Sequence, residues 1–221
     1  EGIAVLRNNP TITVTENADF LHAGNRTNWI RTAFSMKARL LIQLSKTPAY
    51  SPANVLAAVD SSYTAAAQEA KVTVFALRNP WATLARNNAA LVLDAWLSTN
   101  LIESMNGARY GYVDPRISRF TDTTRFGDYR GTRNGAGRVG TGTNRDECYL
   151  TTNGFYSADA APLFIITLEE IKFIEAEAAL RASLPARAYT AYIAGITAHM
   201  NKLGISSANR DAYLALPAIG V

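Results

Sequence analysis

Residues 162–203 read PLFIITLEEIKFIEAEAALRASLPARAYTAYIAGITAHMNKL, and this stretch decides the fold. Thr167 followed by Glu170 has the spacing of a capping box, which satisfies two of the free amides at a helix start. Apolar residues then recur at helical spacing, so an amphipathic helix is expected from Leu168 to about Ser183.

A second helix is expected directly after the first. Pro185 cannot continue the first helix, and the apolar pattern resumes from Ala188 to Leu203, with Gly204 placed to end it. Two helices joined by so short a loop form an antiparallel hairpin.

Glu175 breaks the apolar pattern of the first helix. Helix periodicity points its carboxylate toward the core, and a buried carboxylate must be paired or neutralised. We therefore predict a cationic or amide partner on a neighbouring helix, with Arg39 as the candidate. The alternative is that the helix is rotated and Glu175 reaches solvent at the edge of the apolar face.

Three further segments carry helical periodicity. Residues 29–45 form a broad apolar stripe, Ser51 and Pro52 open a helix that runs to about Ala70, and a third helix is expected from Ala89 to Met105. Trp29 and Trp96 lie on these apolar stripes, so we assign both to the core.

Periodicity is lost between Gly107 and Ala161, where Gly, Arg, Asn, Thr and aromatic residues dominate. A long irregular segment in a compact domain is usually functional. Within it, Asp114-Pro115 predicts a short helical turn. Residues 1–26 are expected to be loop with at most one turn of helix.

The predicted architecture is all-α, with helical hairpins of the TPR-like, α-solenoid class and one long irregular loop insertion. We interpret residues 1–221 as a single partial domain. Its helical core comprises residues 28–106 and 162–204, and its insertion comprises residues 107–161. Neither end carries a closing element, so both are expected to be cuts in a longer chain.

Composition excludes several classes of protein. The 221 residues are 48% hydrophobic with a net charge of +4, which is typical of a globular protein and too weakly basic for a nucleic-acid binder. The longest apolar run, 160–166, is far short of the ~20 residues of a membrane span. Cys148 is the only cysteine, and His22 and His199 have no ligand-spaced neighbours. We expect no metal, cofactor or catalytic residue.

Two features of the insertion carry weaker signals. Gly135, Gly137 and Gly140 spell G-x-G-x-x-G, but no strand precedes them and no helix follows, so dinucleotide binding is not expected. Residues 109–145 hold eight arginines against three aspartates. This excess favours either an anionic ligand or simply a solvated basic loop.

Aromatic rings among Arg and Asn are the strongest functional signal. Sugars stack their apolar C–H faces on rings while amide and guanidinium groups bind their hydroxyls. The alternative is that most of these rings only anchor the long loop to the helices, since sugar binding needs only a few of them. The candidate ligand-binding residues are Trp81, Tyr112, Tyr129, Tyr156 and Arg130.

The order of four segments resembles the SusD/RagB-like family of outer-membrane nutrient-binding lipoproteins of Bacteroidetes, especially its SusD-like branch. The segments are WIRTAFSMKARLLIQLSK (29–46), NPW (79–81), DPRI (114–117), and PLFIITLEEIKFIEAEAALRA (162–182) running into YIAGITAHMNKLGIS (192–206). Residues that match the family's pattern and are interpreted as structural are Arg39, Asp114, Pro115, Arg116, Glu175 and Glu177.

The resemblance implies an all-helical, SusD-type fold and a non-enzymatic role at the cell surface. The protein would capture an oligosaccharide or other small nutrient above a SusC-type TonB-dependent transporter, held to the outer membrane by a lipid anchor that this chain lacks. Family members are about twice as long, so this chain would be the middle portion. Two alternatives remain: a carbohydrate-active hydrolase or lyase using loop carboxylates or Tyr and Arg side chains, and a helical adaptor that binds only protein.

Overall fold

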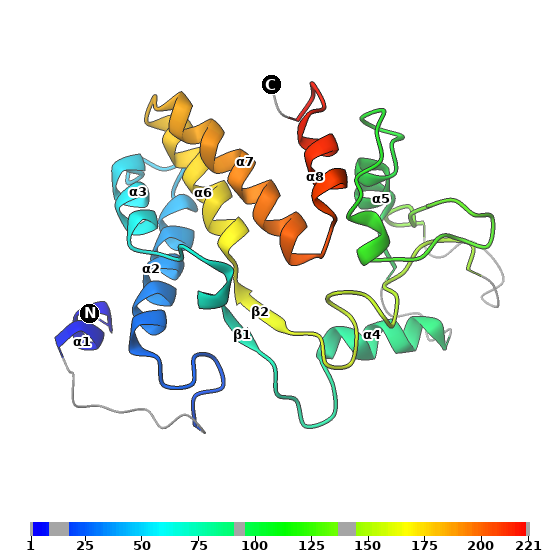
Figure 1. Cartoon of the computed structure of the whole chain (residues 1–221), viewed down its shortest axis with the longest axis horizontal. Coiled ribbons are helices and arrows are strands. Elements are labelled where there is room, and N and C mark those ends of the chain that lie inside the picture. The colour runs from blue at the N-terminus through cyan, green and yellow to red at the C-terminus, as the bar shows by residue number, and fades with distance from the viewer. Residues whose placement is uncertain (1, 9–17, 91–95, 137–144, 220–221) are drawn as a thin grey trace. The chain divides into compact units, whose positions relative to one another are not determined.

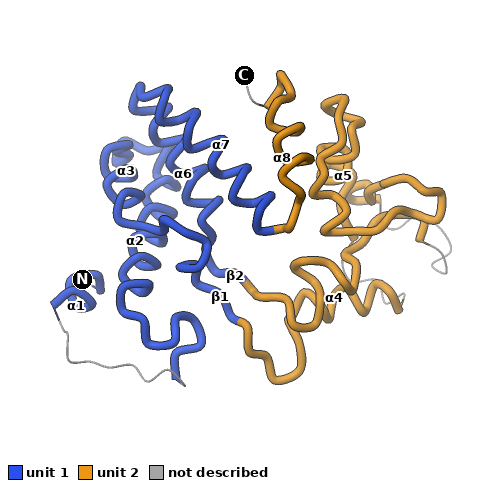
Figure 2. The backbone as a smooth tube through the Cα atoms, in the orientation of Figure 1, with its two compact units in different colours: residues 1–72, 164–202 blue, residues 73–163, 203–221 orange. Residues whose placement is uncertain are grey.

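The computed structural model describes residues 2–8, 18–90, 96–136 and 145–219 (Figure 1). These residues are mostly helical, with a single two-stranded sheet formed by β1 (Ala70–Val72) and β2 (Leu163–Ile166). The predicted all-α class is confirmed. Contacts divide the chain into unit 1, residues 1–72 and 164–202, and unit 2, residues 73–163 and 203–221 (Figure 2). The single partial domain inferred from the sequence stays a prediction.

Unit 1 contains the predicted hairpin. Helix α6 (Leu168–Arg181) starts where expected, with the Thr167 hydroxyl accepting the Glu170 amide at 3.3 Å. Helix α7 (Pro185–Lys202) begins three residues earlier than predicted, because proline is tolerated in the first turn of a helix. Ser183, at φ +59°, makes the turn between the two helices.

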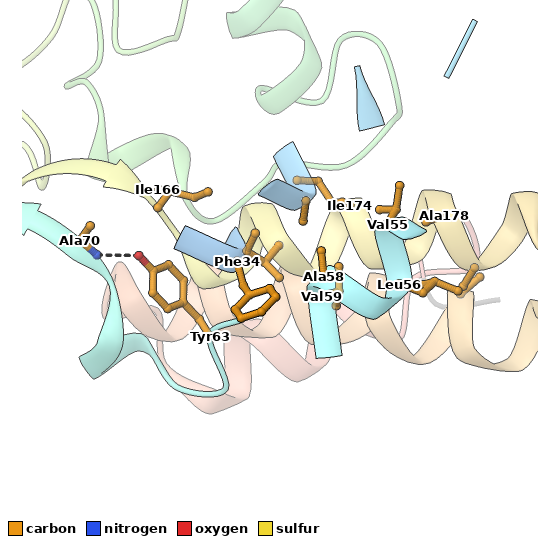
Figure 3. Close-up of a cluster of buried hydrophobic side chains, with 14 residues drawn as sticks. Phe34, Val55, Leu56, Ala58, Val59, Tyr63, Ala70, Ile166, Ile174 and Ala178 are labelled. Atoms are coloured by element: carbon orange, nitrogen blue, oxygen red, sulfur yellow. Dashed lines mark hydrogen bonds between the residues drawn. The ribbon is translucent and has the colours of Figure 1, made fainter. Parts of the chain in front are cut away.

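Helices α1 (Gly2–Asn8), α2 (Arg26–Ile42) and α3 (Pro52–Asp60) complete unit 1. Their apolar faces and that of α6 bury one core, which Figure 3 shows. The core side chains include Phe34, Ala38, Val55, Val59, Tyr63, Ile166, Ile171, Ile174 and Ala178.

The prediction of one helix from Pro52 to Ala70 is wrong in its second half. The chain turns at Ser62, whose hydroxyl donates to Val59 O at 2.6 Å. Tyr63 then points inward, and its hydroxyl accepts the Ala70 amide at 3.1 Å (Figure 3). A buried ring with a satisfied hydroxyl replaces the helix, followed by a short 3₁₀ turn, η2 (Ala66–Gln68).

Glu175 is buried as predicted, at 9% exposure, but its partner is not Arg39. Its carboxylate accepts from Lys172 Nζ and from Arg187 Nε, both at 2.8 Å. Arg39 instead pairs with Glu170 at 2.5 Å. Glu170 lies in the first turn of α6, on the part of the helix that α2 reaches, whereas Glu175 is reached from α7.

Unit 2 contains α4 (Pro80–Ala89), α5 (Thr99–Met105), η3 (Ile117–Arg119) and α8 (Ser207–Leu214). The prediction of one helix from Ala89 to Met105 is wrong, and its residues 91–95 lie outside the described part. Trp96 pairs with Tyr149 in an antiparallel bridge, and Ser98 caps α5. Both Trp96 and Trp29 are half-buried rather than core residues.

The insertion is fastened to α5 by backbone bridges and a small apolar cluster. Asn106 pairs with Val113, and Ser98 pairs with Thr132. The predicted turn at Asp114 is confirmed as a 3₁₀ turn, in which the Ile117 amide donates to Asp114 O at 3.1 Å. The cluster consists of Ile102, Met105, Ile117 and Cys148, with Leu97, Phe120 and Tyr129 packed against it.

Gly131 tests this attachment, because a Cβ there would lie 2.4 Å from the Thr99 nitrogen and 2.5 Å from the carbonyl carbon and oxygen of Ser98. We expect Gly131→Ala to lower the free energy of unfolding, measured by urea denaturation, by about 1–3 kcal/mol. Gly2→Ala is the control, since a Cβ there meets nothing within 4 Å. Equal stability of the two variants would contradict the tight attachment.

Candidate functional site

All five residues predicted to bind a ligand lie in unit 2, but they do not form one cluster, because Tyr156, Tyr112 and Arg130 each contact different rings. Trp81 is the most accessible of their aromatic rings, at 45% exposure. It lies in the first turn of α4, directly after the N-cap residue Asn79 and Pro80 in the sequence. The Trp81 amide donates to Asn79 Oδ1 at 2.8 Å, which fixes the backbone that carries the ring.

A charged cluster lies along α4, with Arg78 just before the helix and Arg86 in its last turn. Asp159 pairs with Arg86 through two hydrogen bonds, Nε to Oδ1 at 2.8 Å and Nη2 to Oδ2 at 2.5 Å. Arg78 lies 3.9 Å from the same carboxylate. The hydrogen bond and charge of Arg86 hold the pKa of Asp159 below its ordinary value. Asp159 therefore remains an anion at neutral pH.

Tyr156 is half-buried among other rings. It stacks on Phe120, with centroids 5.8 Å apart and planes 11° apart, and meets the edge of Phe155 at 4.9 Å. One side of the Tyr156 ring is therefore covered by other side chains, and through these contacts the ring helps to anchor the insertion.

Tyr112 contacts a different set of rings from Tyr156. It stacks on exposed Tyr110 at 6.2 Å and meets Tyr213 of α8 edge-on at 5.7 Å. The Arg116 guanidinium lies 5.7 Å from the centroid of the Tyr213 ring and pairs with buried Asp114 at 2.5 Å. Burial opposes the charge on Asp114, but the hydrogen bonds and charge of Arg116 outweigh it, so the pKa of Asp114 lies below its ordinary value. Burial and the Asp114 charge raise the pKa of Tyr213.

Asp114 gives a pH prediction with a defined sign. Its folded-state pKa is lowered, so its stabilising contribution is present above the unfolded-state value of ~3.9 and is lost as the pH falls through the folded-state pKa. In urea denaturation over a series of acidic pH values, wild type should lose more stability than Asp114→Asn. Parallel losses would contradict the assigned pairing.

Tyr129 and Arg130 are neighbours in the sequence but make different contacts. Tyr129 packs against the apolar cluster of unit 2, and burial raises the pKa of its hydroxyl. Two guanidinium groups lie over the exposed ring of Phe126. The Cζ atom of Arg130 is 4.4 Å from the ring centroid, and that of Arg125 is 4.5 Å from it. Phe126 was not among the predicted residues, because nothing in the sequence separates an exposed ring of this segment from a buried one.

Four arginines of the insertion have their positive charge neutralised by a paired aspartate. A ligand anion would have to displace a carboxylate to reach these guanidinium groups. The pairs are Arg116–Asp114, Arg125–Asp146, Arg130–Asp128 and Arg145–Asp122.

The described residues hold no group of three or more His, Cys, Asp or Glu side chains that could bind a metal ion. Within unit 1, His22 Nε2 lies 2.6 Å from the Thr32 hydroxyl, and burial lowers the pKa of this histidine. Gly135 occupies a turn at φ +78°, whereas Gly137 and Gly140 of the glycine motif lie outside the described residues.

Comparison with known families matches residues 3–220 to the SusD-like family described as "Starch-binding associating with outer membrane". This chain belongs to that SusD-like family. The comparison with curated protein sequences gave no match.

Solved SusD homologs share the fold. A SusD homolog from Bacteroides ovatus aligns with a TM-score of 0.78 at 24% identity, covering 96% of this chain and 44% of the other. A SusD homolog from Bacteroides uniformis aligns with a TM-score of 0.79 at 23% identity, covering 97% of this chain and 44% of the other. A chitin-binding protein aligns with a TM-score of 0.73 at 18% identity, covering 96% of this chain and 50% of the other. This SusD-like chain thus spans less than half the length of the two SusD homologs.

At these identities the structural likeness shows the fold alone. It confirms the SusD-type helical architecture that the sequence predicts. Among the described residues of this SusD-like chain, no helix has the length and apolar character needed to cross a membrane.

Proposed function

We propose that this SusD-like chain binds a glycan without chemical turnover and belongs to a cell-surface protein of the outer membrane. The carrying observation is the match of residues 3–220 to a family described as starch-binding and associated with the outer membrane. A chitin-binding protein with the same fold gives further support for a glycan as the ligand class.

Trp81 is the proposed principal contact. Its ring is exposed while its backbone is fixed by the Asn79 cap, so a sugar face can stack on it with little ordering cost. Tyr112, Tyr129, Tyr156 and Arg130 remain proposed contacts of unit 2 for a longer glycan, through their hydroxyl and N–H groups.

Four carboxyl groups of unit 2 have lowered pKa values, which makes them unsuited to be the proton donor of a glycosidase. A glycosidase needs one carboxylic acid with a raised pKa as proton donor. The shifts go the other way for Asp114, Asp122, Asp128 and Asp159, whose pKa values all lie below the ordinary value. These four groups are carboxylates at neutral pH.

The finer proposal is delivery. The glycan would pass to a SusC-type TonB-dependent transporter, with the complete protein held at the cell surface by a lipid anchor. Co-purification of such a transporter with the full-length protein from mildly solubilised outer membranes tests this step. A full-length protein that purifies alone under conditions that keep other transporter complexes intact would contradict it.

A glycan panel tests the binding proposal. The chain is incubated with maltoheptaose, chitohexaose and an oligogalacturonate, and both retention and chain length of the glycan are measured. Retention with the glycan intact is the expected result. Shortened products would instead favour the hydrolase or lyase, and failure to retain any glycan of a broader neutral and acidic panel would favour the protein-only adaptor.

A further inference from the structure

Asn79 uses every polar group of its side chain inside the protein, and it is fully buried. Its Oδ1 accepts the Trp81 amide at 2.8 Å. Its Nδ2 donates to Ala161 O at 2.7 Å and to Tyr156 O at 3.2 Å. One amide therefore joins the first turn of α4 to two points of the insertion about eighty residues later in the chain.

The backbone of Asn79 makes a fourth attachment. Its amide donates to Asp159 O at 2.9 Å. Asp159 in turn receives two side-chain hydrogen bonds from Arg86, further along α4. Asn79 thus fixes both the backbone that carries the exposed Trp81 ring and the segment that carries the Arg86–Asp159 pair.

We propose that Asn79 is the positioning residue of a neutral-sugar site formed by the Trp81 ring and the Arg86–Asp159 pair. This inference rests on the proposed glycan-binding function. Asn79 does not itself touch the sugar. It holds the ring and the polar pair in one arrangement before the ligand arrives, which lowers the ordering cost of binding.

The Arg86–Asp159 pair suits the hydroxyls of a neutral sugar. Both side chains are about half exposed, so each keeps hydrogen-bonding capacity toward solvent. A sugar hydroxyl both donates and accepts, and it can use the carboxylate oxygens and the guanidinium N–H groups together. The opposite charges cancel, so the pair gives no net attraction to an acidic sugar.

Asparagine is the residue type that this position needs. It combines one acceptor for a helix N-terminal amide with two donors for the carbonyls of Ala161 and Tyr156. Asn79→Ser keeps an oxygen that can cap α4 but lacks the amide donors. Asn79→Asp keeps the acceptor and places a carboxylate against two carbonyl oxygens, unless it is protonated.

These two variants separate capping from positioning. Calorimetric titration with maltoheptaose and chitohexaose is carried out at neutral pH and at about pH 5, where a buried carboxyl with a raised pKa is protonated. We expect both variants to bind roughly tenfold more weakly at neutral pH, the loss of about one buried hydrogen bond. Asn79→Asp should recover at the lower pH, because the protonated acid can donate to Ala161 O, and Asn79→Ser should not.

Wild type and Trp81→Ala are the controls. The charged groups facing position 79 are Arg78, Arg86 and Asp159, and wild type reports any effect of their titration. If Trp81→Ala binds weakly while both Asn79 variants bind like wild type, the positioning role is wrong and the glycan site stands. If Trp81→Ala binds like wild type, the proposed site itself is wrong.

Hydrogen exchange gives a readout that needs no ligand. Faster exchange of the amides of residues 157–161 in both variants than in wild type at neutral pH, with a largely retained melting temperature, supports the positioning role, because both variants lose the amide donors to Tyr156 O and Ala161 O. Faster exchange of residues 81–83 is not expected in either variant, because both keep an oxygen that can cap α4. Unchanged exchange of residues 157–161 in both variants would overturn the inference, even if neither probe glycan binds wild type.

Discussion

Replacing Lys202 with methionine should lower the free energy of unfolding by about 3–5 kcal/mol at neutral pH, because it leaves buried carboxylates without their cation. Lys202 ends α7, and its Nζ donates to Glu69 at 2.8 Å and to Glu169 at 2.6 Å. The side chains of Lys202 and Glu69 are only 6% and 1% exposed. Methionine retains the apolar stem and removes the charge.

Glu69 makes this cluster costly to break. Its carboxylate also accepts the Leu168 amide at 2.7 Å, in the first turn of α6. Burial outweighs these favourable contacts and raises the pKa of Glu69. A raised carboxyl pKa means that stability is present at low pH and is lost as the pH rises through the folded-state value. The Lys202→Met defect should therefore shrink on acidification.

Lys172→Met is the matched control for Lys202→Met. Lys172 also pairs with a glutamate of α6, but its side chain is 29% exposed and Glu175 keeps Arg187 as a second partner. We expect a change of less than about 1 kcal/mol in urea denaturation. A Lys202→Met variant no less stable than Lys172→Met would contradict the view that the buried cluster stabilises unit 1.

Local signals in the sequence were sufficient for the α6–α7 hairpin. The Thr167 cap, the apolar stripe and Pro185 each act within one or two helical turns. The structure has both helices, with α7 starting three residues before the predicted start. The Lys202 cluster could not be predicted in this way. Its partners come from residues 69 and 169, and only the folded chain brings them together.

The failed helix predictions have a common physical reason. Apolar spacing continues through Tyr63 and Trp96, but both residues lie outside the helices and contact distant segments. Tyr63 turns inward to Thr32 and Ala70, and Trp96 pairs with Tyr149, fifty-three residues later. Tertiary contacts override helical periodicity at both positions.

The candidate site was only partly predictable. Ring-rich composition directs attention to unit 2, but exposure depends on which distant segments meet. Tyr156 is half-buried against Phe120 and Phe155, whereas Trp81 projects from a helix start that the sequence does not mark as exposed. The Arg86–Asp159 pair joins residues that are seventy-three positions apart in the sequence, so no local pattern predicts it.

Trp81→Ala should weaken glycan binding by about 2 kcal/mol, roughly thirtyfold in Kd, which is the scale of a tryptophan hot spot. The ring is exposed, so its removal should change the free energy of unfolding by no more than about 0.5 kcal/mol. Leu77→Ala is the matched control, because it removes an exposed apolar side chain just before α4 without removing a ring. Its Kd should stay near that of wild type.

The glycan site at Trp81 is tested by calorimetric titration of wild type, Trp81→Ala and Leu77→Ala with the glycan that wild type retains from the panel. The expected result is binding without product formation by wild type and Leu77→Ala, and roughly thirtyfold weaker binding by a fully folded Trp81→Ala. Equal affinity of Trp81→Ala and wild type would contradict a glycan site built on the exposed ring at the start of α4.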